Sequence, residues 1–144
     1  MKQEEKQLLL ADLSTRLPYG VKCHFKYGSA EDDITLSCID NNVARFEYGW
    51  YGSFHVSIDA DYIKPYLRPM SSMTDEEKNE LKQISDDYLN EWENAKTSLE
   101  KWKLDAKVNY KNAMFYNSNH LDWNDLTSKG LALQAPEGMY KMEE

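Results

Sequence analysis

Few cysteines, prolines and glycines occur in this chain, and the scarcity of cysteine excludes two kinds of site. The 144 residues include 2 cysteines, 4 prolines and 6 glycines. Cys23 and Cys38 have no CxxC spacing and no clustered histidines around them, so neither a disulfide framework nor a zinc site is expected. We expect two buried free thiols and no bound metal.

Long apolar runs are also missing. The first eleven residues, MKQEEKQLLLA, contain an apolar stretch that is too short, and too closely flanked by charge, for a signal peptide or a membrane span. We therefore expect no membrane association and a cytoplasmic location.

Common catalytic motifs are absent as well. The sequence contains no P-loop, no dinucleotide-binding glycine fingerprint, no nucleophile elbow and no zinc-protease helix. The three histidines lie far apart in the chain, and no acidic cluster has the spacing of a calcium loop. We expect a noncatalytic protein without a cofactor.

Positive charge is scarce relative to negative charge. The chain has 17 Lys and Arg against 25 Asp and Glu, and the net charge is about −2 over residues 1–70 and about −6 over residues 71–144. An acidic surface repels phosphate, which argues against direct nucleic-acid binding. The acidity fits either a solvated helix face or an acidic mimic of nucleic acid.

The first half of the chain favours strands. The apolar spacing of residues 3–13, with acidic residues in the first turn, predicts a first helix that ends before Pro18. Apolar and polar residues then alternate in four short stretches, which is typical of strands with one solvated face. We predict an antiparallel four-stranded meander with apolar positions Val21, Cys23, Phe25, Tyr27, Ile34, Leu36, Cys38, Ala44, Phe46, Tyr48, Phe54, Val56 and Ile58.

The segment KPYLRPMSSMTDEE, residues 64–77, predicts a joint between strands and helices. Pro65 and Pro69 disfavour helix for the residues before them, so at most a single helical turn is expected over residues 61–64. Thr74 then begins a Thr-x-x-Glu capping box with Glu77, which predicts the start of a helix.

Apolar residues beyond the joint follow a helical period of about 3.6 residues. One long helix, or an antiparallel hairpin broken near Leu104 and Asp105, fits this stripe, and the hairpin is the more compact answer. Three aromatic members, Tyr88, Trp92 and Trp102, either pack within the chain or anchor an interface with a protein partner or a second copy. The stripe consists of Leu81, Ile84, Tyr88, Trp92, Ala95, Leu99, Trp102 and Ala106.

Residues 122–130 predict a short C-terminal helix, with Asp122 as its cap and Leu126 as its apolar contact. The sequence therefore predicts an α+β fold: an N-terminal helix, a four-stranded meander, a long charged helix or hairpin, and a short last helix. Because no repeat or flexible linker is present, we expect one domain over residues 1–144, with a strand-rich half (1–70) and a helical half (74–130).

Two rigid segments carry both a cation and a tyrosine, one around Pro18 and one between Pro65 and Pro69. An arginine can bind a carboxylate or a peptide through two parallel hydrogen bonds, or it can brace loop carbonyls. A ligand site between the sheet and the helices would also include His120 and Asp122. The candidate binding residues are Arg16, Tyr19, Tyr66, Arg68, His120 and Asp122.

Three segments, about a third of the chain, carry a resemblance. They are LLLADLSTRLPYGV (8–21), KPYLRPMSSMTDEE (64–77) and HLDWNDLTSKGLALQAPEGMY (120–140). They resemble an uncharacterised family of small proteins encoded in gut Bacteroidales genomes, often within phage or mobile-element neighbourhoods. Relatives tend to have Arg and Gly where this chain has Asn124 and Asp125. The resemblance implies a genomic context and no activity.

The leading functional prediction is a noncatalytic protein-interaction or accessory module in a mobile-element context. It follows from the charged, aromatic helix and the lack of a catalytic constellation. The alternatives are a small enzyme or ligand-binding domain with a site between sheet and helices, and an acidic nucleic-acid mimic or regulator.

Overall fold

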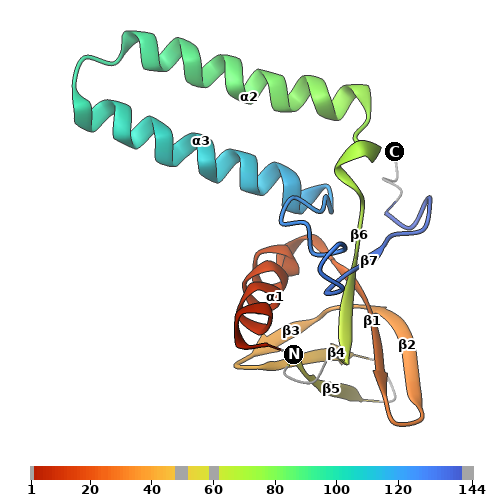
Figure 1. Ribbon diagram of the computed structural model, residues 1–144. Coiled ribbons are helices and arrows are strands. Elements are labelled where there is room, and N and C mark those ends of the chain that lie inside the picture. The colour runs from red at the N-terminus through yellow and green to blue at the C-terminus, as the bar shows by residue number, and fades with distance from the viewer. Residues whose placement is uncertain (1, 48–51, 59–61, 141–144) are drawn as a thin grey trace.

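The molecule has two parts: a body of one helix and two small sheets, and a helical hairpin that projects from it (Figure 1). The computed structural model describes residues 2–47, 52–58 and 62–140. The helices are α1 (Gln3–Arg16), α2 (Asp75–Asn94) and α3 (Ser98–Ser118), with short 3-10 turns η1 (Leu17–Tyr19) and η4 (Met70–Ser72). The strands are β1 (Lys22–Tyr27), β2 (Ala30–Thr35), β3 (Cys38–Asp40), β4 (Val43–Glu47), β5 (Ser53–Ser57), β6 (Ile63–Leu67) and β7 (Leu133–Gln134).

The predicted α+β class is confirmed, and the first helix ends before Pro18, as predicted. None of the helices in the described ranges is long and apolar enough to cross a membrane. Tyr48 and Asp61, which enter the strand and turn predictions, lie outside the described residues.

The strands form two sheets, so the prediction of a single four-stranded meander is wrong. One sheet has the order β2-β1-β6-β7 and the other the order β3-β4-β5. The predicted strand over residues 34–38 is divided, because Leu36 N donates to Val21 O at 2.9 Å and Ser37 N donates to Arg45 O at 3.0 Å. Two neighbouring residues thus bond to different sheets, and the chain changes sheet between them.

β6 is a central strand, although the sequence predicts at most one helical turn at its start. It pairs with β1 on one edge and with β7 on the other, and Pro65 lies opposite Cys23. Lys26 N donates to Tyr62 O at 2.9 Å. Because hydrogen-bonded pairs alternate along an antiparallel ladder, the Cys23–Pro65 pair is one that exchanges no N–H bond. Pro65 therefore fits without interrupting the ladder to β1.

Stacked phenylalanines join the two sheets. The ring of Phe25 in β1 lies 5.2 Å from that of Phe46 in β4 and 4.7 Å from that of Phe54 in β5. Leu9 and Leu13 of α1 are fully buried in the same core. The core of the body is therefore shared by α1 and both sheets, which is how the apolar sheet faces are covered.

Both cysteines are free thiols, as predicted; Cys23 is buried and Cys38 is half-buried. Burial raises the pKa of the Cys23 thiol above its ordinary value. The thiol is therefore protonated at neutral pH and acts as a small apolar core group.

α2 and α3 form an antiparallel hairpin, which confirms the more compact of the two predicted arrangements. The break lies at residues 95–97, so the prediction of a break at Leu104 and Asp105 is wrong. The Thr97 hydroxyl accepts from Glu100 N at 3.1 Å, and the Glu100 carboxylate accepts from Lys96 N at 2.8 Å. This second Thr-x-x-Glu sequence caps α3 and fixes its first residue at Ser98, directly after the turn.

Both ends of the hairpin meet just after the end of β6. Arg68 N donates to His120 O at 2.7 Å, and Asp122 N donates to Arg68 O at 2.8 Å. Arg68 and Leu121 form a parallel bridge, and β7 continues beside β6. The hairpin is therefore an insertion between β6 and β7.

Residues 122–130 form turns, so the prediction of a short helix there is wrong. Asp122 does act as a cap, since its carboxylate accepts from Leu126 N at 2.8 Å and from Thr127 N at 3.0 Å. Asp125 has a φ of 56°, which lies in the left-handed region and prevents a right-handed helix from continuing. Leu126 is buried in the core, as predicted.

Candidate functional site

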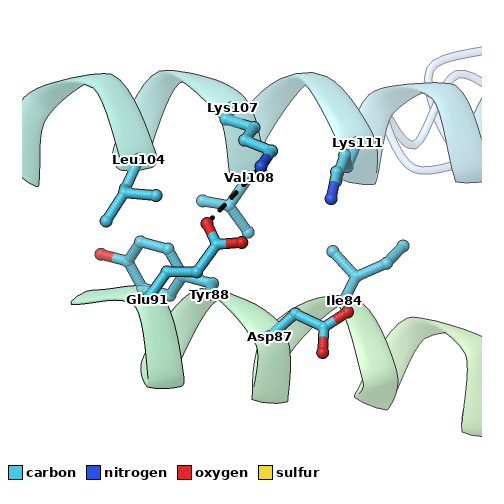
Figure 2. Close-up of a pocket in the computed structure, with 8 residues that line it drawn as sticks. All are labelled: Ile84, Asp87, Tyr88, Glu91, Leu104, Lys107, Val108 and Lys111. Atoms are coloured by element: carbon cyan, nitrogen blue, oxygen red, sulfur yellow. Dashed lines mark ion pairs between the residues drawn. The ribbon is translucent and has the colours of Figure 1, made fainter. Parts of the chain in front are cut away.

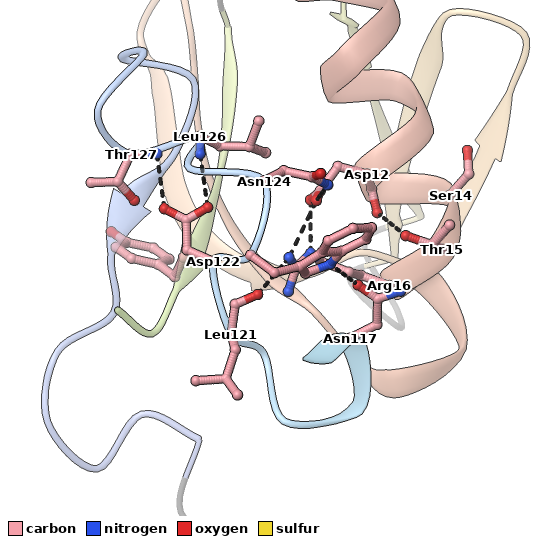
Figure 3. Close-up of polar contacts among 12 residues, drawn as sticks. Asp12, Ser14, Thr15, Arg16, Asn117, Leu121, Asp122, Asn124, Leu126 and Thr127 are labelled. Carbon is pink, nitrogen blue, oxygen red and sulfur yellow. Dashed lines mark hydrogen bonds and ion pairs between the residues drawn. The ribbon is translucent and has the colours of Figure 1, made fainter. Parts of the chain in front are cut away.

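Arg16 lies in the interior of the body (Figure 3). Its Nε donates to Asp12 Oδ2 at 2.7 Å, and its Nη2 donates to Leu121 O at 2.7 Å. Asn124 Nδ2 donates to Asp12 Oδ1 at 2.9 Å. Buried charges persist when they are paired and hydrogen-bonded in this way. Arg16 thus fastens α1 to residues 121–124 by bracing a carbonyl.

Arg68 fixes the joint between the body and α2. Its Nη1 and Nη2 donate to the two carboxylate oxygens of Glu77 at 2.8 and 2.7 Å, and to Asn119 O and Ser72 O at 3.1 Å. Thr74 N also donates to Glu77, at 2.9 Å, which completes the predicted capping box. These bonds, that from Arg68 foremost, hold the pKa of Glu77 at about 2. Arg68 is thereby neutralised within the chain.

Tyr66 belongs to a polar cluster on β1, β2 and β6. Its hydroxyl donates to Asp33 Oδ1 at 2.7 Å, and His24 Nδ1 lies 2.7 Å from the same oxygen. Glu31 Oε1 lies 3.0 Å from His24 Nε2. Burial and the bond to Asp33 raise the pKa of Tyr66 to about 12, and the bonds from Tyr66 and His24 lower the pKa of Asp33. Asp33 is therefore an ionised acceptor, and Tyr66 a neutral donor.

His120 packs the C-terminal segment onto the sheet. Its ring stacks on that of Tyr140 with 3.7 Å between centroids. Burial, reinforced by nearby arginine and lysine charges, lowers the pKa of His120 to about 4, so the imidazole is neutral at neutral pH. The Tyr140 hydroxyl donates to Tyr66 O at 2.7 Å and accepts from Lys22 N at 2.8 Å. The stack and these hydrogen bonds hold the C-terminal segment against β1 and β6.

The six predicted binding residues thus make separate contacts. Tyr19 is half-buried in η1. Backbone hydrogen bonds bring Arg68, His120 and Asp122 together, but the three side chains hold a helix start, an aromatic stack and a turn. These residues were predicted as candidates because they are polar and lie in rigid segments. In the structure, the side chains of Arg16, Arg68 and Asp122 hydrogen-bond to neighbouring segments of the same chain.

A cleft of about 1000 Å³ lies beside Arg68. The start of α2 forms one wall and the C-terminal segment the other, and the walls carry several carboxylates. Within the ranges that the structure describes, no three His, Cys, Asp or Glu side chains are grouped to hold a metal ion. The lining residues are Arg68, Pro69, Ser72, Thr74, Glu76, Glu77, Glu80, Asn119, Gln134, Ala135, Pro136, Glu137, Gly138 and Tyr140.

A thin apolar seam joins α2 to α3 (Figure 2). The Tyr88 hydroxyl donates to Asp105 across this seam, so Tyr88 packs within the chain. Lys107 Nζ lies 3.5 Å from Glu91 Oε2. The seam is lined by Ile84, Asp87, Tyr88, Glu91, Leu104, Lys107, Val108 and Lys111. Apolar contacts in the middle and opposite charges at the side hold the hairpin together.

Large apolar side chains cover the outer surface of the hairpin. Trp102 is 67% exposed, Tyr110 66% and Leu99 59%. Trp92 is 39% exposed, with Lys101 Nζ lying 4.3 Å from the centre of its ring. Of the predicted interface residues, Trp92 and Trp102 therefore lie at the surface. Isolated exposed apolar residues are ordinary, but a row of them on one helix marks an interaction surface.

The predicted apolar stripe lies in the seam on α2 but not on α3. Ile84 and Tyr88 line the seam, whereas Leu99, Trp102 and Ala106 are exposed, and Leu104 and Val108 line the seam from α3. The break at residues 95–97 resets the helical phase, so the stripe of α2 does not continue into α3. The Thr-x-x-Glu sequence at Thr97 is the signal from which a separate phase for α3 could have been found.

No protein-family model, curated protein or solved structure matches this chain. The family resemblance of the three segments therefore stays a prediction from the sequence.

Proposed function

We propose that this protein is a noncatalytic interaction module whose helical hairpin docks on a protein partner. The exposure of Trp102 (67%) and Tyr110 (66%) on a helix that reaches away from the body carries this proposal. Tryptophan and tyrosine are the residue types that most often anchor protein interfaces. Covering them on binding removes apolar surface from water, which favours association.

Rigid attachment of the hairpin supports the same function. The bridge between Arg68 and Leu121 holds both ends of the hairpin, and the Arg68–Glu77 pair sets the first turn of α2. A surface that is already ordered loses less conformational entropy on binding. The body then serves as the base that orients the hairpin.

Two other functions rank below this one. A small enzyme with a site between sheet and helices lacks support, because the side chains of Tyr66, Arg68, His120 and Asp122 are engaged in separate internal contacts. An acidic nucleic-acid mimic is weakened by α3, which carries 4 lysines and 2 carboxylates. We further propose a cytoplasmic location, which the two free thiols support.

Site-specific photo-crosslinking in the host cell tests the interaction function. Benzoylphenylalanine replaces Trp102 in one variant and Tyr27, a 53% exposed aromatic residue of the body, in the control. We expect a defined partner adduct from position 102 and none from position 27. The purified partner should bind Trp102→Glu about tenfold more weakly than wild type, which corresponds to about 1.4 kcal/mol.

Two results would count against the proposal. Adducts with the same set of proteins from both positions would show that the hairpin has no preferred contact. Adducts between two copies of this chain alone would replace the partner by a homodimer.

A further inference from the structure

α3 has a second apolar face, on the side away from the seam. Its members, which we call the outer face of α3, are Leu99, Trp102, Ala106, Tyr110 and Met114. Spacings of 3, 4, 4 and 4 residues keep them on one side of a helix with 3.6 residues per turn. All five are exposed. A helix that is apolar on two opposite sides is suited to packing between two neighbours, and α2 is one of them.

The charges beside the outer face are positive. Lys103 lies on the same half of the helix surface as the outer face, and so does Lys107, which also pairs with Glu91 of α2. The carboxylates of this stretch are engaged elsewhere: Glu100 accepts from Lys96 N at 2.8 Å, and Asp105 accepts from a tyrosine hydroxyl of α2. The outer face therefore combines an apolar row with lysines.

The seam shows the charge and the apolar pattern of the helix that already packs against α3. α2 has 8 Asp and Glu residues against 2 lysines, and its apolar stripe includes Ile84 and Tyr88. Beside that stripe, Glu91 lies 3.5 Å from Lys107 of α3 (Figure 2). α2 is thus an acidic amphipathic helix on a basic one. The outer face offers the same combination to a second helix.

We infer that the outer face of α3 binds an acidic amphipathic helix of a partner protein. The row from Leu99 to Met114 is about 22 Å long at 1.5 Å per residue, so the bound helix needs about four turns. Apolar residues three and four apart would meet the row, and Asp or Glu beside them would meet Lys103. The inference rests on the proposed function and specifies the chemistry of the partner.

Charge argues against a second copy as the occupant. Packing the outer faces of two α3 helices together would bring Lys103 of both copies into one interface. Like charges brought together without partners oppose association. A partner helix rich in Asp and Glu meets no such repulsion.

Fluorescence anisotropy of labelled peptides, titrated with the full chain, tests this chemistry. The acidic probe is a synthetic peptide with the sequence of residues 75–94, and the basic probe has every Asp and Glu of that sequence replaced by Lys. We expect saturable binding of the acidic probe and at least tenfold weaker binding of the basic probe. Trp102→Glu should weaken binding of the acidic probe at least tenfold, and Lys103→Glu about threefold to tenfold.

Leu89→Glu is the matched control. Leu89 is 52% exposed and lies on α2, away from the outer face of α3, so this variant should bind the acidic probe as wild type does. A probe that exchanged into the seam in place of α2 would be insensitive to Trp102→Glu. That result would overturn the inference.

The remaining outcomes separate this inference from the proposed function. Equal binding of both probes, or no binding of either, overturns the acidic-helix inference, while a partner adduct at position 102 would leave the interaction function intact. Self-association in sedimentation equilibrium that Trp102→Glu abolishes assigns the outer face to a second copy and also overturns the inference. If the position-specific adduct is missing as well, the proposed function fails too.

Discussion

An ion pair between residues four apart on a helix occurs in both parts of the molecule, and its surroundings differ between them. In the body, Asp12 and Arg16 lie 2.7 Å apart with side chains that are 0% exposed. In the hairpin, Lys82 and Asp86 lie 3.3 Å apart with side chains that are 75% and 46% exposed. The same spacing gives a buried brace in one part and a solvated pair in the other.

Apolar side chains differ in the same way. Among the described residues, none of α2 or α3 belongs to the core cluster of the body. Phe25 stacks on two other rings in the core, whereas Trp102 faces water. Core packing therefore constrains the side chains of the body. The hairpin is held by helix caps and a thin seam, so packing does not restrict which side chains its outer surface carries.

The largest difference is expected from removing the acid of each ion pair. Asp12→Ala leaves the buried Arg16 charge without its partner and should lower the free energy of unfolding by about 3–5 kcal/mol. Asp86→Ala should lower it by less than about 0.5 kcal/mol, because exposed pairs four apart contribute little. Urea denaturation at neutral pH measures both. Similar losses of unfolding free energy in the two variants would contradict the difference between the buried and the exposed ion pair.

The joint should give an intermediate effect that depends on pH. The pKa of Glu77 is about 2 in the folded chain against an ordinary 4.5, so the unfolded state binds more protons between these values. The stabilisation by Glu77 is therefore complete above pH 4.5 and is lost as the pH falls towards 2. Glu77→Gln should cost about 1–2 kcal/mol at neutral pH, since it removes a charge-assisted bond to Arg68 and weakens the cap.

Denaturation midpoints at several pH values between 2 and 7 check the prediction for Glu77. The control is Glu76→Gln, which changes an exposed carboxylate in the same helical turn. The Glu77 variant should show a flatter loss of stability in acid than the Glu76 variant. Identical profiles for the two variants would contradict the role given to Glu77.

A smaller effect than that of the Glu77 variant should come from the tip of the hairpin. Thr97→Ala removes the hydroxyl that caps α3 and should cost about 1 kcal/mol. Because the tip lies outside the core, amide hydrogen exchange should speed up around residues 95–101 and stay unchanged in β1. Thr97→Ser keeps a capping hydroxyl and should restore slow exchange. Faster exchange throughout the body would mean that the two parts unfold together.

Local signals predicted α1 and the start of α2 well. The acidic first turn of α1, the Thr74 capping box and the period of α2 each depend on residues a few positions apart. The sheets depend on partners that are distant in the sequence. Leu36 and Ser37 are neighbours in one predicted strand, but Leu36 bonds to Val21 in one sheet and Ser37 to Arg45 in the other. Pro65 predicted only that helix is disfavoured before it, because its place within a strand depends on its pairing with Cys23.

The candidate site divides in the same manner. Residue type alone identified Trp92 and Trp102 as interface candidates, but the face of α3 depends on the break at Thr97. Arg16 was identifiable as a rigid cation, yet its burial depends on Leu121, which lies 105 positions away in the sequence. Long-range packing of this kind leaves no local mark in a sequence.

The adjacent ends of the hairpin make its length independent of the sheet. Arg68 and Leu121 stay side by side whatever lies between them, so one turn added to each of α2 and α3 would move the tip outward by about 5.4 Å. The length of the hairpin can therefore change without a change in the sheet. Variants that differ only in this length would place the tip at different distances from the body.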